Sequence, residues 1–138
     1  MLQRDYFIRL IQEFMAAIVR FLQKDIDQRT DEDLIDIYRQ YVGDFRTLRN
    51  LTVEEAIDYS RNEWTPDQQL RKLEMLAELW YAESTFKLHP LKDMLLEKAF
   101  HLLDYVDAHS TDLSLMRRKH IKEMKEQLDN NLSKKLSE

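Results

Sequence analysis

TPDQQLRKLEMLAELWYAESTFKLHPLKDMLLEKAFHLLDYVD, residues 65–107 of this 138-residue chain, predicts two long helices that fold back on each other. Pro66 follows a threonine, and this pair is typical of a helix start because threonine suits the N-cap and proline the first helical position. Pro90 separates the helices, since the residue before a proline avoids the helical region. We therefore expect helices over residues 65–87 and 91–108.

The first of these helices carries apolar residues on two separate faces. One face holds Leu70, Leu73, Leu76, Ala77 and Trp80, and the other holds Met75, Leu79, Ala82 and Phe86. Arg71, Glu74 and Glu78 lie between the two faces. A helix with two apolar faces has neighbours on both sides. The sequence thus predicts a central helix with Trp80 as a buried anchor.

The composition favours an all-α fold. One Gly and two Pro among 138 residues leave few places where strands could turn tightly. A chain of this length buries about two thirds of the surface that it exposes when unfolded, which is enough for one core. We expect a single helical domain over residues 1–129, followed by a polar C-terminal tail over residues 130–138.

Helix start signals and apolar periodicity predict about six helices in antiparallel hairpins. Besides the central pair, helices are expected at 2–24, 30–42, 52–61 and from a cap at Ser110 or Thr111 to a fraying end at Asn130 and Asn131, with a short turn at 45–48. Thr30 and Thr52 each precede an acidic residue by three positions, which is the capping-box spacing. Gly43 is expected to end its helix in a left-handed conformation.

An apolar pattern recurs with a period of 39 residues. Its positions are Leu34, Ile37, Tyr38 and Tyr41 in the first copy and Leu73, Leu76, Ala77 and Trp80 in the second, with a partial third copy from Leu113. Each of the first two units precedes a helix with a bulky residue and an alanine three apart, Val53 with Ala56 and Leu96 with Ala99. Helix pairs that repeat at such a period are typical of helical solenoids.

The second unit, with Leu96 and Ala99 in "LLEKAFHLLDYVD", resembles a tetratricopeptide (TPR) repeat, in which a small residue lets two helices approach closely. It departs from that pattern in its longer interhelical connection and in Lys92, which stands where a small residue is typical. The opening "DYFIRLIQEFMAAIVRFL" and the overall layout are similar to an uncharacterised bacterial family with a TPR-like fold. That resemblance implies a right-handed helical stack and brings no known activity or site residues.

The distribution of charge argues against a nucleic-acid binder. Residues 25–67 carry twelve Asp or Glu against five Arg and no Lys, and the net charge of the chain is −5. Such a surface repels phosphate backbones. Charged residues interrupt the N-terminal apolar stretch, and no apolar run reaches the length of a membrane span. We expect a cytoplasmic protein that binds neither nucleic acid nor membranes, and the absence of Cys fits a reducing compartment.

Two groups of residues resemble chemical sites. Asp93, Glu97, His101 and Asp104 form a polar row with residue types that bind metals, and His120 with Glu123 offers a second pair. The row lies opposite the apolar face of its helix, whereas carboxylate-bridged metal sites of helical bundles point inward. His109, Ser110 and Asp112 contain the residue types of a nucleophilic site, but adjacent residues at a helix boundary are typical caps. We expect no catalytic residues, no metal ligands and no cofactor.

Aromatic residues could mark a binding groove, because Trp and Tyr are favoured at interfaces. The candidates are Tyr59, Trp64, Tyr81 and Tyr105, of which Trp64 is expected to pack beside a helix start and Tyr81 to be the most exposed. The function that the sequence favours is a non-enzymatic interaction module with a protein partner. One alternative is a homo-oligomer held by the first helix or by Met124, Leu128 and Leu132, and another is a metal protein or enzyme.

Overall fold

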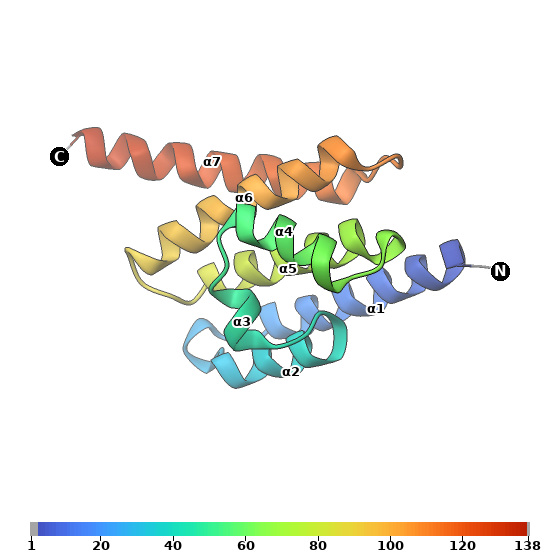
Figure 1. The fold of residues 1–138 in the computed structure, drawn as a ribbon. Helices are drawn as coiled ribbons and strands as arrows, with labels where there is room; N and C mark the ends of the chain where they lie inside the picture. The colour runs from blue at the N-terminus through green and yellow to red at the C-terminus, as the bar shows by residue number, and fades with distance from the viewer. Residues whose placement is uncertain (1–2, 138) are drawn as a thin grey trace.

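The computed structural model describes residues 3–137 and is all-helical over that range, as the sequence predicts (Figure 1). It contains seven α-helices, one more than the expected six or so, and one short 3-10 helix. The elements are α1 Gln3–Leu22, η1 Ile26–Gln28, α2 Asp31–Tyr41, α3 Phe45–Arg49, α4 Val53–Glu63, α5 Pro66–Ser84, α6 Leu91–His109 and α7 Leu115–Ser137. The extra helix is α3, which lies where the sequence predicts a short helical or irregular turn.

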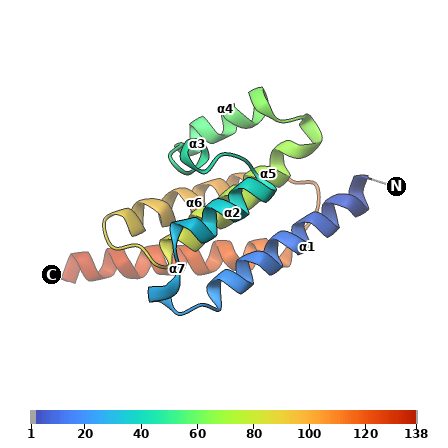
Figure 2. The ribbon, with the colours of Figure 1, turned by 90° about the horizontal axis from the view of Figure 1, so that it is seen from below.

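Helix α5 is the centre of the fold. It contacts α1, α2, α3, α4 and α6, and α7 packs on α6 and reaches α5 through Arg117 and His120. In Figure 1 these helices form successive layers, with α7 over α6, α6 over α5, and α1 with α2 on the opposite side. Figure 2 shows that α3 and α4 cover one flank of the layers. The two apolar faces of α5 are therefore both covered, and Trp80 is 0% exposed, as predicted.

Local capping interactions position the helices where the sequence places them. The Thr30 hydroxyl accepts a hydrogen bond from Asp33 N, and Thr52 does the same from Glu55 N, with both capping boxes complete. Gly43 follows α2 with φ of +148°, a backbone conformation that L side chains rarely adopt. A Cβ at this position would lie 3.2 Å from Leu48 Cδ1. Glycine is thus required here both for the turn and for the close approach of α3.

The two copies of the 39-residue pattern occupy equivalent places in the core. All eight positions, Leu34, Ile37, Tyr38, Tyr41, Leu73, Leu76, Ala77 and Trp80, are buried. The partial third copy is wrong, because Leu113 precedes α7 and is 62% exposed. The pattern therefore marks the buried faces of α2 and α5, and it does not extend into α7.

Both predicted ends of the last helix need correction. Its cap is Ser114, whose Oγ accepts a hydrogen bond from Arg117 N at 3.1 Å. Ser110 instead ends α6, where its Oγ donates to Val106 O at 2.7 Å. Fraying at Asn130 and Asn131 is also wrong, since α7 continues to Ser137. The helix continues past Asn131 because this part of it contacts α6, where Asn131 Nδ2 donates to Asp93 Oδ1 at 3.0 Å.

Candidate functional site

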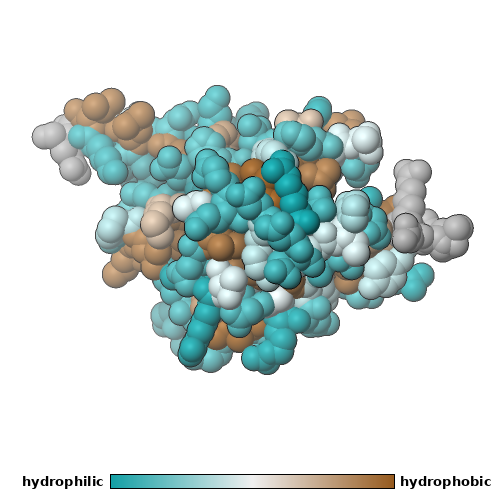
Figure 3. Space-filling view, viewed as in Figure 1, coloured by the Kyte–Doolittle hydropathy of each residue, from teal (hydrophilic) through white to brown (hydrophobic). Residues whose placement is uncertain are grey.

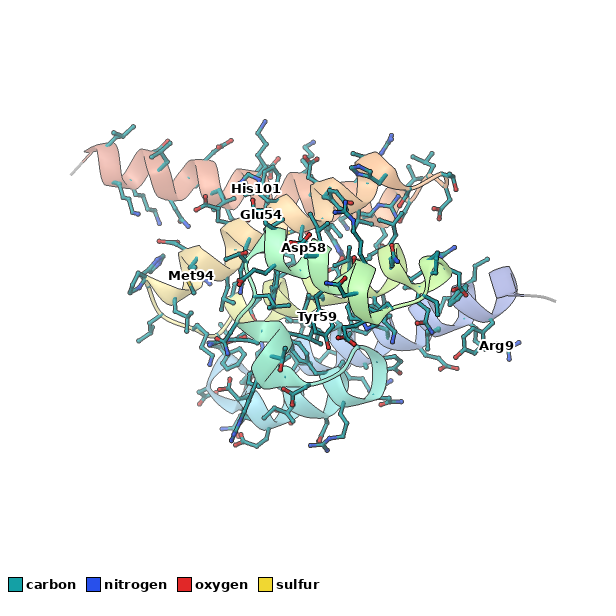
Figure 4. The ribbon with its side chains drawn as sticks, viewed as in Figure 1. Arg9, Glu54, Asp58, Tyr59, Met94 and His101 are labelled. Atoms are coloured by element: carbon teal, nitrogen blue, oxygen red, sulfur yellow. The ribbon has the colours of Figure 1, made fainter. Side chains whose placement is uncertain are left out.

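A concave surface lies between the α3–α4 connection, the start of α4 and the side of α6 that carries Met94, Glu97 and His101. We call it the α4–α6 groove; its volume is about 590 Å³ and its lining is Arg49, Asn50, Leu51, Thr52, Val53, Glu54, Met94, Glu97, Lys98 and His101. Figure 4 labels three of these residues, Glu54 on α4 and Met94 and His101 on α6. A volume of this size lies within the range of roughly 300 to 1,000 Å³ that is typical of ligand pockets.

Lys98 holds one wall of the groove in place. Its Nζ donates to Arg49 O at 2.6 Å and to Leu51 O at 3.0 Å, and it lies 4.2 Å from the centre of the Trp80 ring. Arg49 is the last residue of the short helix α3 and Leu51 lies two residues beyond it, where carbonyl groups lack helical partners. Burial lowers the pKa of Lys98 to about 8. Lys98 therefore ties the α3–α4 connection to α6 and to the central tryptophan.

A buried ion pair lies behind the same wall. Arg49 Nε lies 3.1 and 3.0 Å from the two carboxylate oxygens of Glu83, and Nη2 lies 2.6 Å from Oε2. The Glu83 side chain is 0% exposed, and Lys87 Nζ approaches it at 3.3 Å. Because Arg49 is engaged in this pair and Lys98 in its two carbonyl contacts, the exposed charges of the groove are the carboxylates of Glu54 and Glu97.

The prediction that the polar row of α6 faces solvent holds for three of its four residues. Glu97, His101 and Asp104 face solvent, but Asp93 faces α7, so its outward placement is wrong. Asp93 Oδ2 also lies 2.8 Å from His89 Nδ1. Glu97 and His101 are 4.0 Å apart. Within residues 3–137, no group of three or more His, Asp or Glu side chains is placed to hold a metal ion.

The structure separates the residues of the suggested nucleophilic site. His109 Nδ1 lies 2.9 Å from Tyr105 O, and Ser110 Oγ bonds Val106 O, so both side chains serve the last turn of α6. The carbonyl of Asp112 accepts a hydrogen bond from Arg117. These contacts make the segment a helix end and a connection, in which serine is not paired with a base.

The four aromatic candidates lie in different places. Tyr59 and Trp64 meet edge to face at 5.4 Å, and Trp64 is 9% exposed, as its predicted packing requires. Tyr81, expected to be the most exposed, is half-buried against α7, and its hydroxyl accepts a hydrogen bond from Gln127 Nε2 at 3.0 Å. Tyr105 stacks on His109. The aromatic residues thus do not line the α4–α6 groove.

The predicted oligomer stripe is divided between core and surface. Met124 is 0% exposed and belongs to the core, whereas Leu132 is 57% and Leu136 79% exposed near the free end of α7. Figure 3 shows apolar surface at this end, on a face that is otherwise mostly hydrophilic.

Among the described helices, none has the combination of length and apolarity needed to cross a lipid bilayer.

Sequence reasoning missed the buried charges of α5. Glu74, Glu78 and Glu83 are at most 9% exposed, and each has a cationic partner on another element. Glu78 Oε2 lies 2.6 Å from His120 Nδ1 on α7. The sequence suggests Glu123 as the neighbour of His120, whereas the structure pairs His120 with Glu78. The burial of Glu74 and Glu78 could have been predicted from their position between two apolar faces. A helix that is covered on both faces has little surface left that solvent can reach.

Comparison with models of protein families, with curated proteins and with solved structures gives no match. The α4–α6 groove combines apolar surface with exposed carboxylates at its edge, whereas the geometry at His109 and Ser110 does not form a nucleophile and its base.

His101→Ala is expected to change the free energy of unfolding by less than about 0.5 kcal/mol, because the His101 side chain is 58% exposed. Chemical denaturation followed by circular dichroism measures this change. A loss of several kcal/mol would show that His101 belongs to a structural site.

The His120–Glu78 pair is expected to make stability depend on pH. The hydrogen bond to Glu78 raises the pKa of His120 above its ordinary value of 6.5. A group with a raised pKa in the folded state stabilises the protein below its unfolded pKa, and that contribution is lost as pH rises through the folded value. As pH rises above 6.5 and through the raised pKa of the folded state, the wild type should thus lose stability relative to His120→Gln.

The comparison with His120→Gln is needed because Lys98 acts in the opposite direction. Its pKa of about 8 lies below its ordinary value of 10.5, so its contribution to stability rises with pH between those values. Subtracting the two unfolding curves removes the Lys98 contribution, which both proteins share. A difference that stays constant with pH would contradict the ion pair.

Proposed function

We propose that this chain is a non-enzymatic interaction module that binds a segment of a protein partner in the α4–α6 groove. The observation that carries the proposal is an open groove with Leu51, Val53 and the 54% exposed Met94 among its lining residues. Methionine side chains adapt to varied partners and are common at binding surfaces. An open groove of this size suits a short extended or helical segment better than a small molecule enclosed on all sides.

The scaffold that we propose for this module is TPR-like. It is supported by the two buried copies of the 39-residue pattern on α2 and α5 and by the antiparallel pair of α5 and α6. Stacked helix pairs present extended surfaces to partners. We also propose a cytoplasmic location and a bacterial source, the first supported by the absence of Cys and the second by the resemblance of the opening stretch.

The test is affinity capture from a native lysate with the wild type and two matched variants. Met94→Gln replaces an apolar side chain of the groove with an uncharged polar one, and Leu88→Gln makes the same kind of change at an 84% exposed residue outside its lining. We expect a specific protein to be retained by the wild type and by Leu88→Gln and lost with Met94→Gln. Recovery of no specific protein, or equal recovery by all three, would contradict the proposal.

A second candidate function is homo-oligomer formation, and the exposed Leu132 and Leu136 on α7 favour it. Helices that pair with each other bury apolar side chains that lie on adjacent turns of one face. Light scattering at a high micromolar concentration measures the mass directly. A monomer under these conditions would eliminate this candidate.

A further inference from the structure

We infer that the segment bound in the α4–α6 groove carries an apolar side chain beside one or more lysine or arginine residues. This inference rests on the proposed function, because it names the chemistry of the partner of that same groove. Three features of the lining support it: the apolar surface, the engagement of its cations, and the exposure of its carboxylates.

The apolar surface of the groove comes from both of its sides. Leu51 and Val53 flank the N-cap of α4, and Met94 contributes from the first turn of α6. Leu51 and Val53 also pack against the core, so they are held in place while part of their surface stays open. A partner that inserts one apolar side chain between them and Met94 removes this surface from water, which favours binding by about 25 cal/mol for each Å² buried.

The two cations of the lining are already used within the protein. Arg49 forms its bidentate pair with the fully buried Glu83. Lys98 donates to Arg49 O and Leu51 O and lies against the face of Trp80. An acidic segment would have to compete with these buried partners, which costs more than a contact with an exposed cation.

The carboxylates of the lining remain open to solvent. Glu54 is exposed in the first turn of α4, and the Glu97 side chain is 67% exposed on α6. Asp58 lies one turn after Glu54 and is also exposed, with Arg61 Nη1 at 3.7 Å. Glu54 and Glu97 come from opposite sides of the groove, so a segment between them has an exposed carboxylate on either side. These carboxylates can pair with a cationic partner and repel an acidic one.

The test starts from an unbiased library of peptides displayed on phage and selected on the full-length chain, with the uncharged variant Met94→Gln as the negative selection. We expect the enriched peptides to combine a large apolar residue with adjacent Lys or Arg. Synthetic copies of these peptides, labelled with a fluorophore, then give dissociation constants by anisotropy.

The charge inference is tested with two double variants that change the net charge equally. Glu54→Lys with Glu97→Lys reverses the groove carboxylates, whereas Glu13→Lys with Glu126→Lys reverses exposed carboxylates on α1 and α7. The first pair should weaken binding of the enriched peptide about tenfold, and the second less than about twofold. Raising the salt concentration from about 0.05 to about 0.5 M should weaken wild-type binding in the same direction.

The outcomes separate this inference from the proposed function. If no peptide is enriched on the wild type over Met94→Gln, both are overturned. If enriched peptides depend on Met94 but carry acidic residues or no charge preference, the proposed function stands and the inference is overturned. Equal weakening by both double variants would also overturn it, because the effect would then arise from net charge alone.

Discussion

Trp80→Ala is expected to lower the free energy of unfolding by about 3 to 5 kcal/mol, a large part of the stability of a domain of this size. Trp80 is 0% exposed towards the C-terminal end of α5, and the ammonium group of Lys98 lies 4.2 Å from the centre of its ring. Truncation removes the apolar contact with the surrounding helices and leaves a cavity at the centre of the fold. Urea denaturation followed by circular dichroism gives the free energy.

Two further variants show whether burial causes the loss. Leu88→Ala removes a large apolar side chain that is 84% exposed, and it should cost less than about 0.5 kcal/mol. Trp80→Phe should cost clearly less than Trp80→Ala, because phenylalanine keeps most of the buried area. It also removes an indole N–H for which the described residues offer no hydrogen-bond acceptor. An unchanged unfolding midpoint in Trp80→Ala would show that α5 is not the central helix.

The central hairpin and the helix starts could be predicted because their causes are local. Pro66 and Pro90 act on the backbone of their own and neighbouring residues, and the caps at Thr30 and Thr52 each involve a residue three positions away. The burial of Trp80 followed from the period of the apolar pattern. None of these inferences needs knowledge of which helix packs against which.

The ion pairs and the groove could not be predicted because they join residues that are distant in sequence. Glu83 and Arg49 are 34 residues apart, and the contact of Lys98 with Leu51 O spans 47. Amphipathic periodicity treats Glu74 and Glu78 as solvent-facing, whereas their helix is covered from several sides. The same limit explains the error at the C-terminal end of α7, where the contact of Asn131 with Asp93 depends on how α7 lies on α6.

Arg117→Met, as a single substitution, is expected to lower the free energy of unfolding by about 3 to 5 kcal/mol. The Arg117 side chain is 2% exposed and joins three segments. Its Nη1 lies 3.3 Å from Glu74 Oε1 on α5, its Nε donates to Asp107 Oδ1 on α6 at 2.9 Å, and its Nη2 donates to Asp112 O. Removing the guanidinium leaves a buried carboxylate without its counter-ion, which costs far more than the loss of an exposed ion pair.

Arg118→Met is the matched control, because Arg118 also contacts Asp107, at 3.3 Å, but its side chain is 61% exposed. It should cost less than about 1 kcal/mol. Burial already raises the pKa of Glu74, so Glu74→Gln should restore part of the stability of Arg117→Met by removing the uncompensated charge. Equal losses from Arg117→Met and Arg118→Met would mean that the Arg117 guanidinium is open to water in solution. Fully additive losses in the double variant would mean that α7 is not held to α5 through this pair.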